Sequence, residues 1–220
     1  MALLLDIKYP EWLEDADLRD ELLRYTPDAD IRIGADPGNL DEIEMLTVSN
    51  YLPGEALKYP SLKLIQKTGA GVNNILGDAE LPEHIQVTRL QTSTSGKEMA
   101  EYALAYVLQE QRHIRQYREQ QARSEWISYP PRRAGETTVA VLGLGRIGAE
   151  VAQRFLHNDF KVTGWSRSLK QLPGVDCHAG EAGLADALAP ADYVVSVLPS
   201  TDDTRDATVL GIFIIRNDDW

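Results

Sequence analysis

The sequence lacks the features of an exported, disulfide-bonded or membrane-spanning protein. Cys177 is the only cysteine among 220 residues, so neither an internal disulfide nor a multi-cysteine metal site can form. The apolar run from Ala2 to Leu5 is followed by Asp6 and Lys8, which leaves it too short for a signal peptide or a membrane span. We therefore expect a protein of the reducing cytoplasm that binds no metal and no membrane.

Positive charge is also scarce. Aspartate and glutamate outnumber lysine and arginine by 34 to 22, which gives a formal net charge of −12 at pH 7. Because a surface of this sign repels a phosphate backbone, we expect no nucleic-acid partner. With 43% hydrophobic residues, the chain can bury a sizeable core and form one large domain or two smaller ones.

Short apolar runs alternate with amphipathic segments along the chain. Strands are predicted at residues 2–7, 43–48, 62–65, 138–142, 160–165 and 193–198. Helical spacing of apolar residues follows the first strand at Leu18, Leu22 and Tyr25, recurs at Ile147, Val151 and Phe155, and predicts a further helix at 184–188. The alternating order predicts the α/β class, with parallel sheets covered by helices.

The longest predicted helix runs from Ser95 to Gln121. Ser95 and Glu98 have the spacing of a reciprocal N-terminal cap. The apolar face predicted for this helix comprises Met99, Ala103, Val107, Ile114 and Tyr117. Residues 126–135 contain two consecutive prolines and two consecutive arginines, break all periodicity, and predict a linker.

A glycine pattern typical of dinucleotide binding lies between the strand at 138–142 and the helix that follows it. In this G-x-G-x-x-G, Gly143 permits a tight turn, Gly145 lets a pyrophosphate approach the backbone, and Gly148 lets the helix pack closely on the strand. The predicted pyrophosphate contacts are Gly143, Gly145, Arg146, Ile147 and Gly148. An ordinary turn between strand and helix is the alternative, and Arg146 is equally consistent with a solvated side chain.

The next strand ends without the acidic residue that binds a ribose 2′-hydroxyl in NAD sites. In its place stand a guanidinium and hydroxyl groups, which suit a 2′-phosphate, so NADP(H) is favoured over NAD(H). The predicted contacts are Trp165, Ser166, Arg167, Ser168 and Lys170. A solvated surface loop is the alternative interpretation of Arg167 and Lys170.

Four stretches resemble the D-2-hydroxyacid dehydrogenase family, and most closely its branch of glyoxylate/hydroxypyruvate reductases. They are Lys67 to Ile75, Met99 to Tyr102, Gly143 to Gly148 with Trp165 to Ser168, and Leu198 to Thr201 with Thr204 and Arg205. Their order and spacing match the family throughout, so the resemblance covers about residues 1–206.

The resemblance implies hydride transfer between a nicotinamide cofactor and a small 2-keto acid, such as glyoxylate or hydroxypyruvate. It also implies a flavodoxin-like substrate domain at 1–95 and a Rossmann dinucleotide-binding domain at 96–220, with the site in the cleft between them. Backbone N–H groups around Gly69, Ala70, Gly71 and Val72 would bind the carboxylate, as a glycine-rich loop can do. Without the family, this loop is merely a turn before a helix.

Three further assignments follow from the resemblance. Leu198, Pro199, Ser200 and Thr204 would lie along the cofactor ribose, although a plain exit from a strand is the alternative. Residues 50–52, from Asn50 to Leu52, would line the cleft. The helix at 95–121 resembles the family's dimer arm and predicts a homodimer, although such an apolar stripe is as often internal packing.

The family's catalytic arginine, glutamate and histidine have no counterpart in this sequence, so no catalytic residue is assigned. The four histidines, expected at ordinary surface positions, are His84, His113, His157 and His178. Residues 208–220 no longer resemble the family, and we expect the dinucleotide sheet to be incomplete and to expose an apolar edge. Three hypotheses stay open: a reductase represented by an incomplete chain, a cofactor-binding and dimer-forming module without turnover, and an aggregating remnant.

Overall fold

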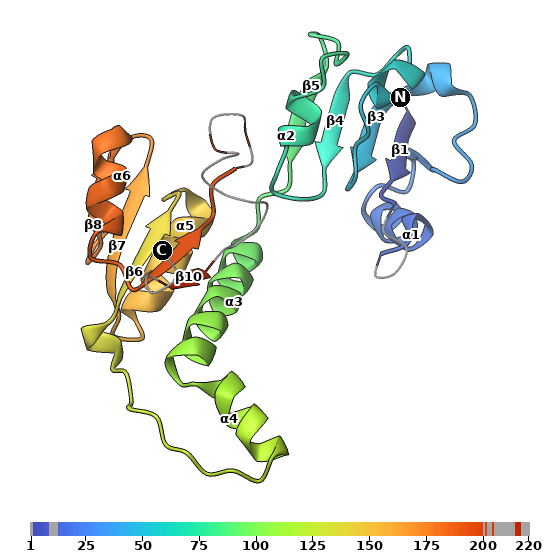
Figure 1. Ribbon diagram of the computed structural model, residues 1–220. Coiled ribbons are helices and arrows are strands. Elements are labelled where there is room, and N and C mark those ends of the chain that lie inside the picture. The colour runs from blue at the N-terminus through green and yellow to red at the C-terminus, as the bar shows by residue number, and fades with distance from the viewer. Residues whose placement is uncertain (1, 9–12, 200, 202–203, 205–213, 217–220) are drawn as a thin grey trace. The chain divides into compact units, whose positions relative to one another are not determined.

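The computed structural model describes residues 2–8, 13–199, 201, 204 and 214–216 (Figure 1). The chain divides into two compact units, Met1–Gln91 and Thr92–Trp220. Each unit contains one five-stranded sheet. The roles expected for residues 1–95 and 96–220, as substrate domain and dinucleotide domain, stay predictions.

The first unit is built on a parallel sheet with strand order β2-β1-β3-β4-β5. Its strands are β1 Ala2–Asp6, β2 Asp30–Ile33, β3 Ile43–Val48, β4 Leu64–Lys67 and β5 Gln86–Arg89. Its helices are α1 Asp15–Tyr25 and α2 Asn73–Leu76, with short 3-10 turns at Leu40–Glu42 and Glu55–Lys58. This strand order confirms the α/β class expected from the alternating pattern and the flavodoxin-like fold that the resemblance implied.

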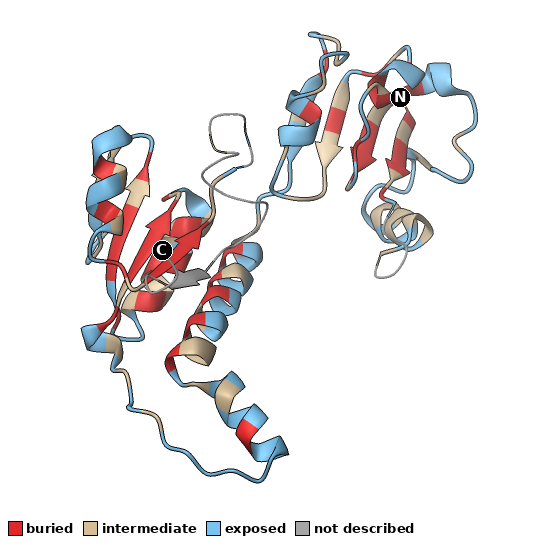
Figure 2. Ribbon diagram, in the orientation of Figure 1, coloured by how far each residue is buried: buried red, intermediate tan, exposed pale blue. Residues whose placement is uncertain are grey.

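The core of the first unit lies on the central strands, where Figure 2 shows the buried residues concentrated. Leu4 on β1, Leu46 on β3 and Ile65 on β4 are almost wholly buried. The core continues beyond the strands through Tyr51 and Ile75. Removing these apolar side chains from water is the main contribution to the stability of the unit.

The second unit has the strand order β10-β9-β6-β7-β8. Its strands are β6 Thr138–Leu142, β7 Lys161–Ser166, β8 Asp176–Ala179, β9 Tyr193–Ser196 and β10 Ile214–Arg216. The pairings of β6 with β7, β7 with β8 and β6 with β9 are parallel. Counted from β6, the parallel strands have the order 3-2-1-4, which confirms the Rossmann arrangement.

β9 is not the edge of the described sheet, because one further strand follows it, and the expected exposure of an apolar edge stays a prediction. β10 pairs antiparallel with β9, with Ile214 opposite Val195 and Arg216 opposite Tyr193. A strand needs only backbone N–H and C=O groups to cover an edge, so three residues without family resemblance can do it.

The helices of the second unit are α3 Ser93–Gln111, α4 Ile114–Ala122, α5 Arg146–Leu156 and α6 Gly180–Leu188, with a 3-10 turn at Ala134–Glu136. α3 and α5 cover one face of the sheet and α6 the other, whereas α4 extends away from the sheet (Figure 1). Val139 and Val141 join a core with residues of α3 and α5, whereas Ala140 and Leu142 pack in a second cluster with Leu184 of α6. This alternation along β6 is the two-residue period of a strand covered on both sides.

The single helix predicted from Ser95 to Gln121 is in fact two helices. α3 begins at Ser93, capped by Thr92, whose Oγ1 accepts from the Ser95 N–H at 3.2 Å. α3 ends at Gln111, and His113 adopts a left-handed φ of 54° before α4 begins. A left-handed residue interrupts the helical hydrogen bonding, and the ring of His113 stacks on Tyr129 with centroids 4.8 Å apart.

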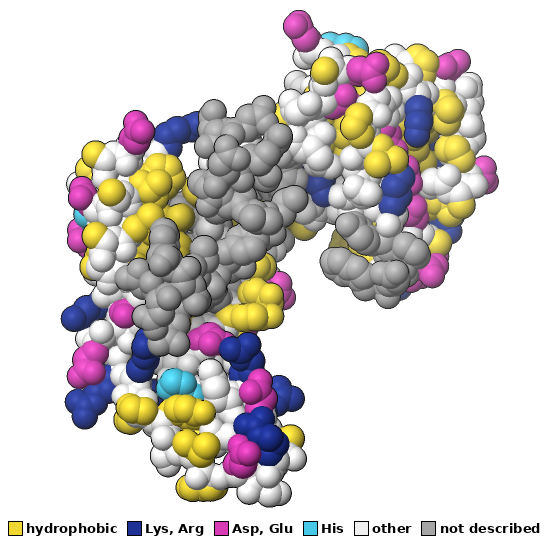
Figure 3. All heavy atoms as spheres, viewed as in Figure 1, with side chains coloured by type: hydrophobic (Ala, Val, Ile, Leu, Met, Phe, Trp, Pro, Cys, Tyr) yellow, Lys and Arg dark blue, Asp and Glu magenta, His cyan; other side chains and the backbone are white. Residues whose placement is uncertain are grey.

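The break changes which side chains are buried. Ala103 and Val107 are buried as expected, but Ile114 and Tyr117 on α4 are 43% and 40% exposed. Figure 3 shows hydrophobic side chains on the visible surface of this part of the unit. In the described part of the chain, no helix combines the length and hydrophobicity needed to cross a bilayer.

Candidate functional site

The segment from Gly143 to Gly148 joins β6 to the first turn of α5 and has two positions that only glycine can occupy. Gly143 has a φ of +98° and its N–H donates to the Trp165 carbonyl at 2.7 Å. A Cβ atom on Gly148 would lie 1.9 Å from the Gly143 carbonyl oxygen, whereas one on Gly145 would meet nothing within 4 Å. Two glycines are therefore required by the fold, while Gly145 leaves open space beside the backbone.

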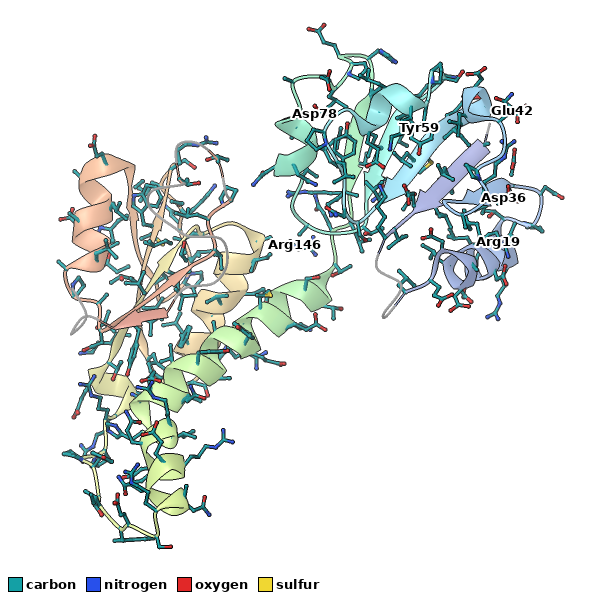
Figure 4. The ribbon with its side chains drawn as sticks, turned by 45° about the vertical axis from the view of Figure 1, so that its right-hand side comes forward. Arg19, Asp36, Glu42, Tyr59, Asp78 and Arg146 are labelled. Atoms are coloured by element: carbon teal, nitrogen blue, oxygen red, sulfur yellow. The ribbon has the colours of Figure 1, made fainter. Side chains whose placement is uncertain are left out.

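The N-terminus of α5 faces that open space. Its N-cap residue is Gly145, and no side chain provides a cap hydrogen bond. The first N–H groups of a helix lack partners within the helix and carry its positive dipole end, so this terminus suits an anion. Arg146, labelled in Figure 4, is exposed at the first helical position, and Ile147 packs against the core.

The turn after β7 combines exposed cationic groups with a side-chain scaffold. Arg167, Ser168 and Lys170 are exposed. Ser166 is buried and donates its hydroxyl to the Ser168 carbonyl at 2.8 Å, and the Trp165 indole donates to the Gly180 carbonyl at 2.7 Å. Ser166 and Trp165 therefore shape the turn, while Arg167, Ser168 and Lys170 are accessible to a ligand.

The turn after β9 meets the phosphate loop. A Cβ on Gly143 would lie 3.1 Å from the Val197 carbonyl oxygen and 3.2 Å from the Leu198 side chain. Thr204 donates to the carbonyl of Pro199 and accepts from the Thr201 N–H at 3.0 Å. Ser200 lies outside the described residues. Because β6, β7 and β9 run parallel, their exits lie at one edge of the sheet, where doubly wound sheets bind ligands.

In the first unit, the loop from Gly69 to Val72 connects β4 to α2. Within the described residues, the N–H groups of Gly69, Ala70, Gly71 and Val72 donate no hydrogen bond. The loop is held from outside, because Nη1 of Arg89 donates to the Ala70 carbonyl at 2.8 Å. Four undonated N–H groups in one short loop are a set of donors that one anion can satisfy.

A hydrogen-bond network links α2 and the residues after it to the segment that follows β3. Nδ2 of Asn74 donates to the Tyr51 carbonyl at 3.2 Å, and the Tyr51 hydroxyl donates to Oδ2 of Asp78 at 2.7 Å. Asp78, labelled in Figure 4, also accepts from the Gly54 N–H at 2.9 Å. Burial and this bond to Asp78 raise the pKa of Tyr51 to about 12, and the Tyr51 hydroxyl lowers the pKa of Asp78.

This network corrects the expectation for residues 50–52. Tyr51 is only 2% exposed and belongs to the core, so only Asn50 and Leu52 are exposed. Sequence reasoning also missed the roles of Asn74 and Asp78. Both residues follow the glycine loop closely in the sequence, and this was the only signal available. It does not reveal that their shared partner is Tyr51, more than twenty residues earlier in the chain.

The histidines divide into two groups. His84 and His157 are exposed, as expected. His113 stacks on Tyr129, and His178 is half-buried on β8 with Nε2 3.2 Å from Oδ2 of Asp176, so for these two the surface prediction is wrong. Among the residues that the structure describes, no three His, Cys, Asp or Glu side chains gather as a metal site.

Comparison with known proteins reveals a consistent group of relatives. A model of the family described as D-isomer specific 2-hydroxyacid dehydrogenase, NAD binding domain, matches residues 104–209. Glyoxylate/hydroxypyruvate reductase A of Klebsiella pneumoniae (strain 342) is 36% identical over 157 residues, which are 69% of this chain and 50% of that protein. The protein of the same name from Serratia proteamaculans is 35% identical over 148 residues, 65% of this chain and 47% of that protein.

Two solved structures share the fold over 92% of this chain, each with a TM-score of 0.81. One is a D-isomer specific 2-hydroxyacid dehydrogenase from Xanthobacter autotrophicus Py2 in complex with NADPH and MES. It is 34% identical in sequence, and the match covers 65% of its length. The other is an NADPH-dependent glyoxylate/hydroxypyruvate reductase from Sinorhizobium meliloti in complex with NADP and sulfate, 28% identical and covered to 64%. The chain thus spans about half the length of the curated relatives it matches.

Proposed function

We propose that the chain is a member of the D-isomer specific 2-hydroxyacid dehydrogenase family and serves hydride transfer between NADP(H) and a small 2-keto acid such as glyoxylate or hydroxypyruvate. In that reaction the bound reduced nicotinamide supplies the hydride. The residues of this chain contribute a dinucleotide site and a carboxylate site.

The dinucleotide site is supported by one observation above all, the contrast among the three glycines of the phosphate loop. Gly143 and Gly148 are packed so tightly that a Cβ would collide, while Gly145 is open beside the uncapped N-terminus of α5. A diphosphate fits this arrangement, because the helix N-terminus offers N–H donors and no Cβ blocks the approach.

The preference for NADP(H) is supported by the turn after β7. Arg167 and Lys170 are exposed there, and no acid occupies the end of the strand. A guanidinium binds a 2′-phosphate through charge-assisted hydrogen bonds, whereas an acid in this position would repel it. The solved relatives from Xanthobacter and Sinorhizobium contain NADPH and NADP, which agrees with this proposal.

The carboxylate site is the loop from Gly69 to Val72. Its four N–H groups donate no hydrogen bond within the described residues, and a 2-keto acid brings a carboxylate that can accept several. The contacts from Arg89 and Asn74 hold the loop and its surroundings in place before substrate arrives. Such preorganisation reduces the entropy lost on binding.

A second candidate function is cofactor binding and dimer formation without turnover. It is favoured by the absence of an assigned catalytic arginine, glutamate and histidine in this chain. A fluorescence titration with NADPH tests the shared part of both proposals, and a glyoxylate-dependent NADPH oxidation assay separates them. We expect NADPH binding with negligible turnover from these 220 residues. A kcat on the order of 1 per second or more would exclude the second candidate.

We also propose a homodimer that forms through α3, α4 and the segment after α4. Tyr102 and Tyr106 on α3 are nearly half exposed, and Trp126 and Ile127 beyond α4 are 95% and 54% exposed. A groove of about 720 Å³ is lined by these last two residues and by α4. Large exposed apolar side chains in one region are typical of an interface.

Sedimentation velocity tests the dimer. We expect a species of twice the 24.5 kDa chain mass, and dissociation by Trp126→Asp, because a charge in an apolar interface is costly. Tyr25→Asp is the matched control, since Tyr25 is 77% exposed but lies in the other unit. A monomeric wild-type chain would contradict the dimer, and large polydisperse species would instead favour the aggregating remnant.

A further inference from the structure

Lys67 is a half-buried lysine without an acidic partner among the described residues. The ammonium of Lys67 has three N–H donors, and one of them donates to the Ser49 carbonyl. No other hydrogen bond of this ammonium is found among the described residues. By contrast, Lys8 in the same unit contacts both Asp6 and Glu55. The chain carries 34 acidic residues, so the lack of an acid beside Lys67 is not a consequence of scarcity.

The position of Lys67 places its charge beside the carboxylate loop. Lys67 is the last residue of β4, and a Cβ atom on Gly69 would lie only 3.5 Å from its Nζ. A Cβ on Gly71 would meet nothing within 4 Å, so the next part of the loop borders open space. An ammonium with unused donors therefore lies beside the first residue of a loop whose four backbone N–H groups also lack acceptors.

The neighbouring strands offer this ammonium no compensating negative charge. The register partner of Lys67 on β5 is Arg89, and its partner on β3 is the uncharged Val48. Register partners extend from the same face of a sheet, so two cations lie side by side at the exits of β4 and β5. Burial lowers the pKa of Lys67, as expected for an ammonium that has lost water without gaining an anion.

We infer that Lys67 is a substrate-binding residue, whose ammonium binds the carboxylate of a small 2-keto acid together with the N–H groups of Gly69 to Val72. This inference rests on the proposed function. The carboxylate supplies the acceptors that both sets of donors lack, and its charge compensates the ammonium in a partly desolvated place. Lys67 thereby adds charge attraction to a loop that by itself offers only dipoles.

Oxamate, a stable analogue of a 2-keto acid, tests this assignment on the full 220-residue chain. Amide NMR at constant ionic strength follows the loop from Gly69 to Val72 as oxamate is added. We expect the resonances of these amides to shift. Lys67→Met should raise the dissociation constant of oxamate about tenfold, because one charge-assisted hydrogen bond is lost. Lys67→Arg keeps the charge and should lose less.

The matched control is Lys63→Met, because Lys63 is exposed, pairs with Glu44 and precedes the same strand. It should leave the oxamate affinity unchanged. A second readout is the pKa of Lys67 itself, measured by NMR of the methylated lysine in the wild-type chain. Bound oxamate should raise this pKa, since an anion that prefers the protonated form must by linkage favour protonation.

Failure of the inference is distinguishable from failure of the proposed function. Equal oxamate affinity of wild type and Lys67→Met, with the loop amides still shifting, would overturn the role of Lys67 and leave the carboxylate loop intact. No shift of the loop amides in the wild type would overturn the carboxylate site altogether, while NADPH titration tests the dinucleotide site independently. If Lys67→Met does not fold, an unchanged pKa of Lys67 on adding oxamate would overturn the inference.

Discussion

Alanine at position 145 and alanine at position 148 add the same methyl group to the phosphate loop, with opposite expected consequences. At Gly145 the new Cβ meets no atom within 4 Å, so stability should fall by at most about 1 kcal/mol, from the weaker helix cap. The methyl group occupies the space through which a diphosphate would approach. A steric cost of about 2 kcal/mol there weakens NADPH binding roughly 30-fold.

At Gly148 the new Cβ would lie 1.9 Å from the Gly143 carbonyl oxygen and 3.0 Å from the Val197 side chain. Backbone cannot yield as a flexible side chain can, so the cost lies at the upper end for overpacking, about 3 kcal/mol. In a unit of this size that lowers Tm by roughly 10 °C. Gly71→Ala, in the other unit and also without neighbours within 4 Å, should change neither property.

Thermal melts by circular dichroism and fluorescence titration with NADPH measure the two effects separately. The expected pattern is a near-normal Tm with weak NADPH binding for Gly145→Ala, and a low Tm for Gly148→Ala. Normal NADPH affinity in Gly145→Ala would show that no diphosphate approaches the loop at that glycine. Equal stability of the two variants would refute the packing argument for Gly148.

Three further predictions address the cofactor preference, a titrating group and the core. Arg167→Ala should weaken NADPH binding about tenfold and leave NADH binding unchanged, and an equal loss for both coenzymes in fluorescence titrations would contradict the 2′-phosphate contact. The pKa of Asp78 is lower in the folded chain than its usual value of 3.8, so the charged carboxylate stabilises the fold above that pH. This contribution to the free energy of unfolding is lost as the pH falls through the pKa of the folded state. The urea midpoint of the wild type should therefore fall more than that of Asp78→Asn between about pH 5 and pH 3, and parallel profiles would refute this. Ile65→Ala, at a side chain with 0% exposure, should cost about 2–5 kcal/mol in urea unfolding, and a loss well below 1 kcal/mol would contradict its place in the core.

The strands that the sequence predicts are those with apolar runs, and the strands it misses are edge strands. β1, β3, β4, β6, β7 and β9 were all expected, within a few residues of their observed ends. β2, β5 and β8 were not expected, and each lies at an edge of its sheet. An edge strand has a neighbour on one side only and tolerates polar residues such as Asp30 or Gln86, so it carries no apolar run to recognise.

The sequence by itself determined the α/β order and the phosphate loop, because both depend on neighbours in the chain. A glycine at 143 or 148 is required by its own turn, and strand, loop and helix follow one another without help from distant segments. The tertiary structure decided what depends on strand register and on packing between remote segments. The helix break at His113, the cover of β9 by β10, and the ammonium of Lys67 on the Ser49 carbonyl arise because residues far apart in the chain are brought within contact distance. No local pattern of residue types encodes such distances, so these features became visible only once the strands were paired.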